Sequence, residues 1–169
     1  TAMDTPLTTV DQVDLERFMG DWFVIASIPT FAEKNAYAPV EPYPLNANGT
    51  INATFRYGKP SNPDVRSEIN ATGYIKDHDT NAVWGMQFIW PIKADYRIIQ
   101  LDPEYQVTMI GRNKRDYLWI MARDYPLPQS ELNQLIDYAR TVGYDTSSLQ
   151  FTSWQTDVEA ASIYVPSAR

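Results

Sequence analysis

Apolar and polar residues alternate along a series of short segments between Gly20 and Arg123, and turn-forming residues separate these segments. Alternation with a period of two places every second side chain on one face of a β-strand, and closely spaced segments of this kind are typical of an antiparallel sandwich or barrel. The pattern predicts eight strands, at residues 21–28, 36–45, 50–57, 66–76, 82–90, 96–101, 105–111 and 116–123. The second of them contains Pro39, Pro42 and Pro44, which have no N–H to donate, so we expect it to be bulged or irregular.

A helical pattern with one apolar face follows the last predicted strand. The apolar face consists of Leu132, Leu135, Ile136, Ala139 and Val142. Ser130 is a suitable N-cap and Gly143 a suitable residue just beyond the C-terminus, so the pattern predicts a helix over about 130–142. An apolar stripe of this kind has to be covered, and we therefore expect the helix to pack on the outside of the sheet.

Nothing in the sequence divides the chain into two domains. There is no repeat and no change of composition, and we expect one domain over residues 14–155, between an N-terminal tail, 1–13, and a C-terminal tail, 156–169. The first three residues, Thr-Ala-Met, look like a remnant of cloning, so we expect the N-terminal tail to be partly foreign, which is compatible with a removed export signal. No stretch reaches the roughly 20 apolar residues that a membrane-spanning helix needs.

The composition excludes several classes of site. The 14 Lys and Arg against 21 Asp and Glu give a net charge of −7, whereas a surface that binds nucleic acid needs an excess of basic residues. With no cysteine there is no disulfide, thiol nucleophile or Cys-bound zinc, and one histidine cannot make a His-rich metal site. His78 lies between Asp77 and Asp79, and we interpret this segment as an exposed turn, because it lacks the glycine and the final glutamate of a calcium loop. We expect neither a metal nor a cofactor.

The alternation also predicts which side chains line the inside of the sheet. A closed sheet of eight strands has an interior that either is filled by side chains or holds one small ligand. Small residues such as Ala71 would face aromatic residues such as Trp84 and leave room for a ligand, and a solid core of the same residues is the alternative. The candidate ligand-contacting residues are Phe55, Tyr57, Ile69, Ala71, Trp84, Met86, Phe88, Trp90, Arg97, Ile99, Tyr117 and Trp119.

Three short motifs point to a family. They are Gly20-Asp21-Trp22, which follows a short helical turn at residues 14–19, Asp102-Pro103-Glu104-Tyr105 in a predicted turn, and Asp116-Tyr117-Leu118-Trp119-Ile120-Met121-Ala122-Arg123 in the last predicted strand. Together they resemble the three signature regions of the lipocalins, closest to the bacterial lipocalin and apolipoprotein D group, and the resemblance extends in order over residues 14–155. It implies an all-β fold, an eight-stranded antiparallel up-and-down β-barrel with one C-terminal α-helix packed on the outside.

The resemblance also assigns structural roles to four signature residues, Gly20, Trp22, Tyr105 and Arg123. The Trp22 indole would close one end of the barrel. The Arg123 guanidinium would stack on that indole and bond nearby carbonyls, and a desolvated cation–π contact of this kind is worth about 2 kcal/mol.

Arg97 is the one charged residue among the candidates for ligand contact. If the opposite face of its strand turned inward, Gln100 would be buried without a partner near the closed end, which is unfavourable. We therefore expect Ile99 and Leu101 to point inward, and Arg97 with them near the open rim. There Arg97 would either pair with a carboxylate of the protein or bind the carboxylate or phosphate of a ligand. The loops at the open end carry six basic and four acidic residues, a balance that would attract an anionic lipid.

The function that the resemblance implies is non-covalent binding and storage or transport of a hydrophobic small molecule, a fatty acid or lysophospholipid, without catalysis. It also implies an extracytoplasmic location, in the periplasm or at the outer membrane, and membrane association through a lipid anchor on a cysteine that this sequence lacks. Two alternatives stay open. One is a lipocalin-type enzyme, for which Glu41 and Tyr117 are the acid–base candidates; the other is an interaction module with a filled barrel, able to form a homodimer.

Overall fold

Seven of the eight strands predicted from the sequence are present among the described residues, in a single antiparallel sheet. The computed structural model describes residues 5–28, 48–58, 66–152 and 155, and at 54–58 and 66–69 it describes the backbone only. The elements are α1 (Leu15–Phe18), β1 (Phe23–Ile28), β2 (Ile51–Gly58), β3 (Arg66–Ile75), β4 (Val83–Ile89), β5 (Ile92–Leu101), β6 (Val107–Gly111), β7 (Leu118–Ala122), α2 (Gln129–Thr141), a 3₁₀ turn (Thr146–Ser148) and β8 (Gln150–Phe151). The sheet order is β2-β3-β4-β5-β6-β7-β1-β8. The predicted strand at 36–45 lies outside the described residues.

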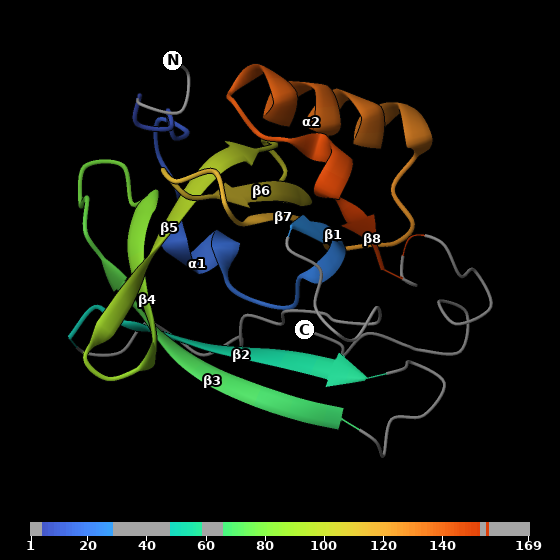
Figure 1. Cartoon of the computed structure of the whole chain (residues 1–169). Helices are drawn as coiled ribbons and strands as arrows, with labels where there is room; N and C mark the ends of the chain where they lie inside the picture. The colour runs from blue at the N-terminus through green and yellow to red at the C-terminus, as the bar shows by residue number, and fades with distance from the viewer. Residues whose placement is uncertain (1–4, 29–47, 59–65, 153–154, 156–169) are drawn as a thin grey trace.

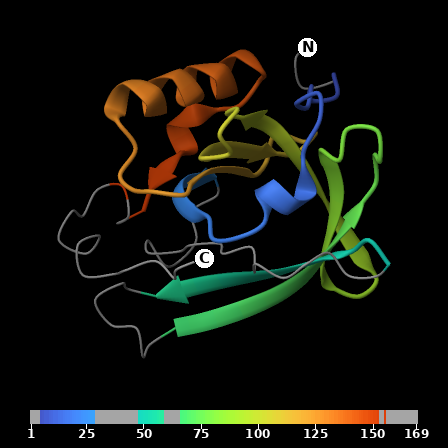
Figure 2. The same cartoon turned by 180° about the vertical axis from the view of Figure 1, so that it is seen from behind.

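The sheet curls round a common interior. Figure 1 shows β2 and β3 facing β6 and β7 across the short helix α1, and Figure 2 shows the same arrangement from behind. Side chains from β1 to β7 and from α1 meet there in one buried group, which we call the inner cluster. Its members are Val13, Phe18, Trp22, Val24, Ile51, Ala53, Ala71, Ala82, Trp84, Met86, Tyr96, Ile98, Ile110 and Met121. The fold class is therefore the predicted one, eight antiparallel strands with a C-terminal helix, although the eighth strand of this sheet is β8, which follows α2 and was not among the eight predicted strands.

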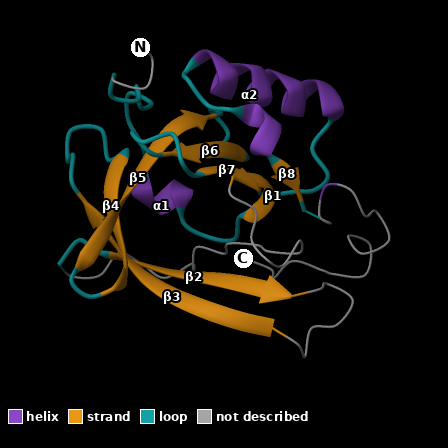
Figure 3. Cartoon of the chain, in the orientation of Figure 1, coloured by secondary structure: helices purple, strands orange, loops and turns teal. Residues whose placement is uncertain are grey.

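Helix α2 lies on the outside of the sheet, along the side formed by β6, β7 and β8 (Figure 3). Alternate residues of the strands beneath it form a second buried group, the outer cluster, with Leu132 and Ala139 of the helix among its members. Both helical side chains are almost fully buried, and Leu135, Ile136 and Val142 pack against the same cluster. The predicted apolar stripe is thus the face by which α2 is attached. Among the described residues, no helix has both the length and the apolar character needed to cross a bilayer.

The ends of α2 are set by Pro128 and Gly143. The helix begins directly after Pro128, so Ser130 lies within the first turn and not at the N-cap, where the sequence interpretation placed it. At the other end Gly143 has a φ of 107°, and the N–H of Tyr144 donates to the carbonyl of Ala139 over 3.1 Å. This hydrogen bond closes a C-terminal cap that favours glycine, as predicted, because an L side chain rarely adopts a positive φ.

The orientation of β5 differs from the prediction because the strand contains a bulge. Its pairing with β6 shifts register between Ile98 and Gln100. Ile98 therefore joins the inner cluster while Ile99 joins the outer one, and Leu101 packs inward again beyond the bulge. The expectation that Ile99 points inward is thus wrong, because it assumed strict alternation; the bulge keeps Gln100 out of the interior in another way.

Candidate functional site

Trp22 and Arg123 close one end of the barrel. Trp22 is 0% exposed, and its Nε1 donates to the Phe18 carbonyl over 2.9 Å. Arg123 Cζ lies 3.7 Å from the centroid of the indole ring, which is the predicted stacking. The guanidinium also donates to four backbone carbonyls, those of Arg17, Phe18, Asp21 and Tyr105. One side chain thus ties α1, the start of β1 and the β5–β6 turn together.

The signature turn between β5 and β6 is fixed by its own side chains. Asp102 Oδ1 accepts from the N–H groups of Gln106 and Val107, at 2.6 and 2.7 Å. Tyr105 has a φ of 57°, and its Oη accepts from the N–H of Asp14 over 2.8 Å. Because Asp14 is also the N-cap of α1, this contact holds the helix across the closed end.

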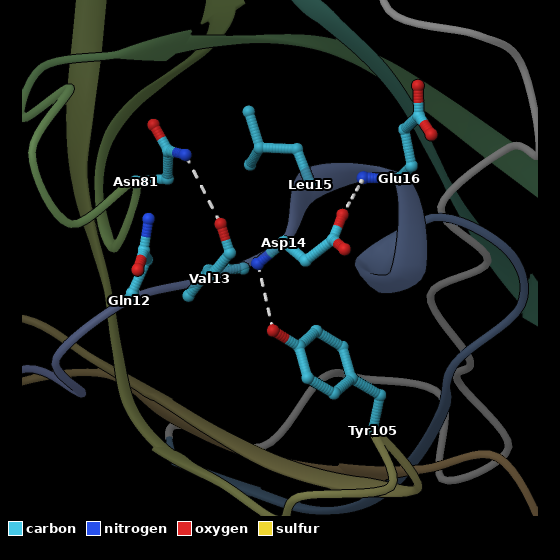
Figure 4. Close-up of a pocket in the computed structure, with 7 residues that line it drawn as sticks. All are labelled: Gln12, Val13, Asp14, Leu15, Glu16, Asn81 and Tyr105. Atoms are coloured by element: carbon cyan, nitrogen blue, oxygen red, sulfur yellow. Dashed lines mark hydrogen bonds between the residues drawn. The ribbon is translucent and has the colours of Figure 1, made fainter.

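A polar hollow of about 550 Å³ lies outside the closed end, beside α1. Its lining, shown in Figure 4, consists of Gln12, Val13, Asp14, Leu15, Glu16, Asn81 and Tyr105. The dashed lines in Figure 4 mark hydrogen bonds between several of its polar groups; Asn81 Nδ2, for example, donates to the Val13 carbonyl over 3.2 Å. Such a surface does not suit a hydrophobic ligand. His78, in the nearby β3–β4 turn, is exposed as predicted, and no three acidic or histidine side chains of the described residues are placed to hold a metal ion.

A continuous series of aromatic rings leads from the closed end along the inner wall. The Phe18 ring lies 5.2 Å from Trp22 and 5.6 Å, edge to face, from Trp84. Trp84 stacks on Tyr96 with centroids 5.2 Å apart, and the Tyr96 ring is 6.3 Å from that of Trp119. Aromatic pairs at these distances add to the stabilisation that burial alone provides. The interior next to the closed end is therefore packed with aromatic rings.

Several of the predicted contact residues do face the interior. Trp84, Met86 and Ala71 are buried members of the inner cluster, and Trp119 packs against it. Small residues line β3, since Gly73 lies so close to Trp84 that an added Cβ would approach the indole to 3.2 Å. The predicted juxtaposition of small and aromatic residues is thus present. The side chains of Phe55, Tyr57 and Ile69, and all of Glu41, lie outside the described residues.

Three other predicted contact residues lie away from the closed end, Phe88 and Trp90 where β4 turns into β5 and Tyr117 directly before β7. Phe88 is 44% exposed, Trp90 82% and Tyr117 37%, so none of them belongs to the buried wall. Tyr117 continues the aromatic series, with its ring 5.8 Å from Trp119. These three residues therefore lie outside the buried wall, whereas the four inward-facing ones belong to the inner cluster or pack against it.

Arg97 does not point into the barrel. It pairs across the sheet with Gly111, which faces Tyr144 and Leu7 of the outer cluster, and its Nε lies 3.0 Å from Asp95 Oδ1. Asp95 Oδ2 also accepts from the N–H of Asn113. Arg97 therefore has a structural partner, and its expected inward position is wrong for the same reason as that of Ile99. Arg112 at the same end is paired with Asp116, so two of the predicted entrance cations are engaged within the protein.

The sequence interpretation missed Tyr96 and Ile98, the residues of β5 that do face inward. The sequence does contain a sign of this orientation, because two adjacent apolar residues, Ile98 and Ile99, interrupt the alternation of apolar and polar residues next to the bulge. Tyr96 is 5% exposed, and burial raises the pKa of its hydroxyl far above the ordinary value for tyrosine. This hydroxyl is neutral at any physiological pH.

Comparison with known proteins gives the family. Residues 13–154 match the lipocalin-like domain family. The chain belongs to the lipocalin family. Lipocalins are typically non-enzymatic proteins that bind hydrophobic small molecules. Temperature-induced lipocalin-1 of Arabidopsis thaliana is 34% identical over 172 residues, covering 95% of this chain and 89% of the plant protein. Outer membrane lipoprotein Blc of Escherichia coli K12 is 27% identical over 143 residues, covering 83% and 79%.

A solved structure supports the fold independently. The cockroach allergen Per a 4 superposes with a TM-score of 0.59, covering 86% of this lipocalin and 90% of the allergen. The sequence identity is 16%, so this likeness concerns the fold alone. It places the described sheet and α2 in the lipocalin architecture.

Proposed function

We propose that this lipocalin binds one hydrophobic small molecule non-covalently inside the barrel and stores or transports it, the ligand being an acyl lipid such as a fatty acid or lysophospholipid. The observation that carries the proposal is the inner wall: apolar and aromatic side chains of seven strands, sealed at one end by Trp22. Transfer of an acyl chain from water to such a wall contributes about 0.8 kcal/mol per methylene group. After the costs of association, an affinity in the micromolar range remains, which suits storage or transfer.

The corrected position of Arg97 changes how the ligand is held. Since Arg97 is bound to Asp95 on the outer face, the proposal contains no ion pair between Arg97 and a lipid headgroup. Affinity then comes mainly from burial of the apolar part of the ligand. Oleic acid and oleyl alcohol should consequently bind within a few-fold of each other.

A displacement titration tests the proposal. A fluorescent fatty acid is bound first, and oleic acid, oleyl alcohol and a lysophospholipid are added as competitors, with quenching of tryptophan fluorescence as a second signal. Ala71→Phe places a large side chain on the inner wall of β3 and should weaken binding at least tenfold. Thr72→Phe, at the adjacent outward position opposite Gln87, is the matched control and should bind as the unmodified protein does. If no competitor displaces the probe saturably, the barrel is filled and the proposal is wrong.

We also propose an extracytoplasmic location, in the periplasm or at the outer membrane. The support is the name of the bacterial relatives, outer membrane lipoproteins that are 27% identical over 143 residues. Fractionation of cells that express the natural gene, followed by immunoblotting, is the test. Recovery in the cytoplasmic fraction alone would refute this location.

A further inference from the structure

The Tyr96 hydroxyl on the inner wall has no hydrogen-bond partner among the described residues. Tyr96 lies on β5 with 5% of its surface exposed, between the rings of Trp84 and Trp119. Within the described part of the chain no hydrogen bond is made by its Oη. A buried hydroxyl in this condition is unfavourable, because it has lost its bonds to water without replacing them.

Three other buried polar groups of the inner wall, those of Trp84, Trp22 and Thr108, have hydrogen-bond partners. Trp84 Nε1 donates to the Asn81 carbonyl over 2.8 Å, and Trp22 Nε1 to that of Phe18 over 2.9 Å. Thr108, 0% exposed, donates from Oγ1 to the Gln100 carbonyl over 2.8 Å. These three side chains of the inner wall therefore have hydrogen-bond partners, whereas the hydroxyl of Tyr96 has none among the described residues.

A second unpaired donor lies next to the first. Trp119 on β7 is partly buried against the inner cluster, and its Nε1 likewise makes no hydrogen bond within the described residues. Its ring centroid is 6.3 Å from that of Tyr96. Both residues lie between the packed rings of the closed end and the exposed ring of Tyr117, so they occupy the middle of the aromatic series.

We propose that Tyr96, assisted by Trp119, forms a polar subsite midway along the barrel that binds a neutral oxygen, a hydroxyl or carbonyl, on the buried part of the ligand. Resting on the proposed function, this inference narrows the ligand to a lipophile that is oxygenated along its chain or ring system. A few convergent polar groups on an otherwise apolar wall are the usual means by which such a pocket selects and orients its ligand.

The electrostatics of the wall favour a neutral group over an anion. Arg123 is the one charged side chain among the buried residues that the structure describes, and it is bound to four carbonyls at the closed end. A carboxylate or phosphate at Tyr96 would therefore be desolvated without a counter-charge, which is costly. The hydroxyl of Tyr96 stays protonated and can either donate to a carbonyl or accept from a hydroxyl.

The test compares ligands that differ only by one mid-chain hydroxyl. Stearic acid, 10-hydroxystearic acid and 12-hydroxystearic acid compete for the fluorescent probe on the unmodified protein and on Tyr96→Phe. Tyr74→Phe is the matched control, since Tyr74 lies on the outer face and its Oη bonds Gln87 Oε1 over 3.2 Å. In the unmodified protein and in Tyr74→Phe, at least one hydroxy acid should bind about fivefold to tenfold tighter, relative to stearic acid, than it does in Tyr96→Phe. Trp119→Phe should show a smaller loss of the same preference.

Three results would overturn the inference, and none of them is the failure of the proposed function itself. The first is an identical preference for hydroxy acids in Tyr96→Phe. The second is equal loss of affinity for stearic acid and both hydroxy acids, which indicates lost packing alone. The third is a lower urea midpoint for ligand-free Tyr96→Phe, because removing an unpaired hydroxyl should leave stability unchanged or raise it. If none of the three acids displaces the probe from the unmodified protein, it is the carrier function that fails.

Discussion

Replacing Arg123 by methionine tests the most heavily bonded side chain of the closed end. Methionine keeps an apolar stem of similar reach but removes the charge and every donor. The contact with the Trp22 ring, 3.7 Å from Cζ to centroid, is nearly desolvated and worth about 2 kcal/mol. Phe18 keeps its bond from Trp22 Nε1, whereas the carbonyls of Arg17, Asp21 and Tyr105 lose the donor contributed by the guanidinium.

The hydrogen bonds lost by those three carbonyls account for the rest of the decrease in the free energy of unfolding of Arg123→Met. A hollow of about 410 Å³ lined by Arg123, Tyr105 and Arg17 lies beside them, so water can replace part of what is lost. With about 0.5–1 kcal/mol for each bond, the total loss is about 4 kcal/mol. For a chain of this size such a loss lowers Tm by roughly 10 °C.

Urea unfolding followed by tryptophan fluorescence measures this loss directly. Arg140→Met is the control, because Arg140 forms an exposed pair with Asp137 whose removal should cost well under 1 kcal/mol. The double variant with Trp22→Leu separates the ring contact from the hydrogen bonds, and a coupling free energy of about 2 kcal/mol is expected between the two sites. Strictly additive losses, or an Arg123→Met protein as stable as Arg140→Met, would show that the stacking does not hold the closed end together.

Three further outcomes follow from the described contacts. Gly111→Ala should cost about 1–3 kcal/mol in urea unfolding, because the new Cβ would lie 2.7 Å from the Tyr144 hydroxyl. That hydroxyl has its pKa raised to about 12, mainly by burial, so the folded state holds its proton more tightly than the unfolded state. The contribution of the Tyr144 hydroxyl to the free energy of unfolding is therefore fully present below pH 10 and is lost as the pH rises toward 12. Over that range the urea midpoint should fall less steeply in Tyr144→Phe than in the unmodified protein. Arg97→Gln should leave the affinity ratio of oleic acid to oleyl alcohol unchanged in the displacement titration, since Arg97 pairs with Asp95 on the outer face; a selective loss for the acid would contradict its position.

The sequence was sufficient for the architecture because the architecture depends on periodicity and on a few motifs. Alternation placed seven strands to within a few residues, and the apolar stripe of α2 predicted the face that packs on the sheet. Trp22 and Arg123 could be paired across about 100 residues of sequence only through the lipocalin resemblance, since nothing in local pattern connects them. The orientation of β5 could not be obtained from alternation, because parity is lost at a bulge and every later side chain changes face.

Adjacent apolar residues in β5 and β1 indicate that both faces of these strands are covered. In β5 the interruption falls at Ile98 and Ile99, and in β1 the register with β7 shifts between Val24 and Ala26. In each strand one apolar residue then serves the inner cluster and its neighbour the outer cluster beneath α2. A strand covered on both faces needs apolar residues on both, which alternation provides at Ile98 and Ile99, and the bulge that follows them keeps the Gln100 side chain out of the inner cluster.

The edges of the same two strands show how segments next to the sheet are attached. The carbonyl of Ile98 accepts from the N–H of Val10 over 3.1 Å, and the N–H of Ile98 donates to the Ala82 carbonyl, so both groups lie on the β4 side of β5. The carbonyl of Ile25 accepts from the N–H of Thr152 over 3.0 Å, next to the pairing of Ala26 with Phe151, and so continues the ladder with β8. A buried carbonyl without a donor is costly. Val10 and Thr152 therefore supply donors where β4 and β8 end, and these two hydrogen bonds attach the N-terminal segment and the chain after β8 to the barrel.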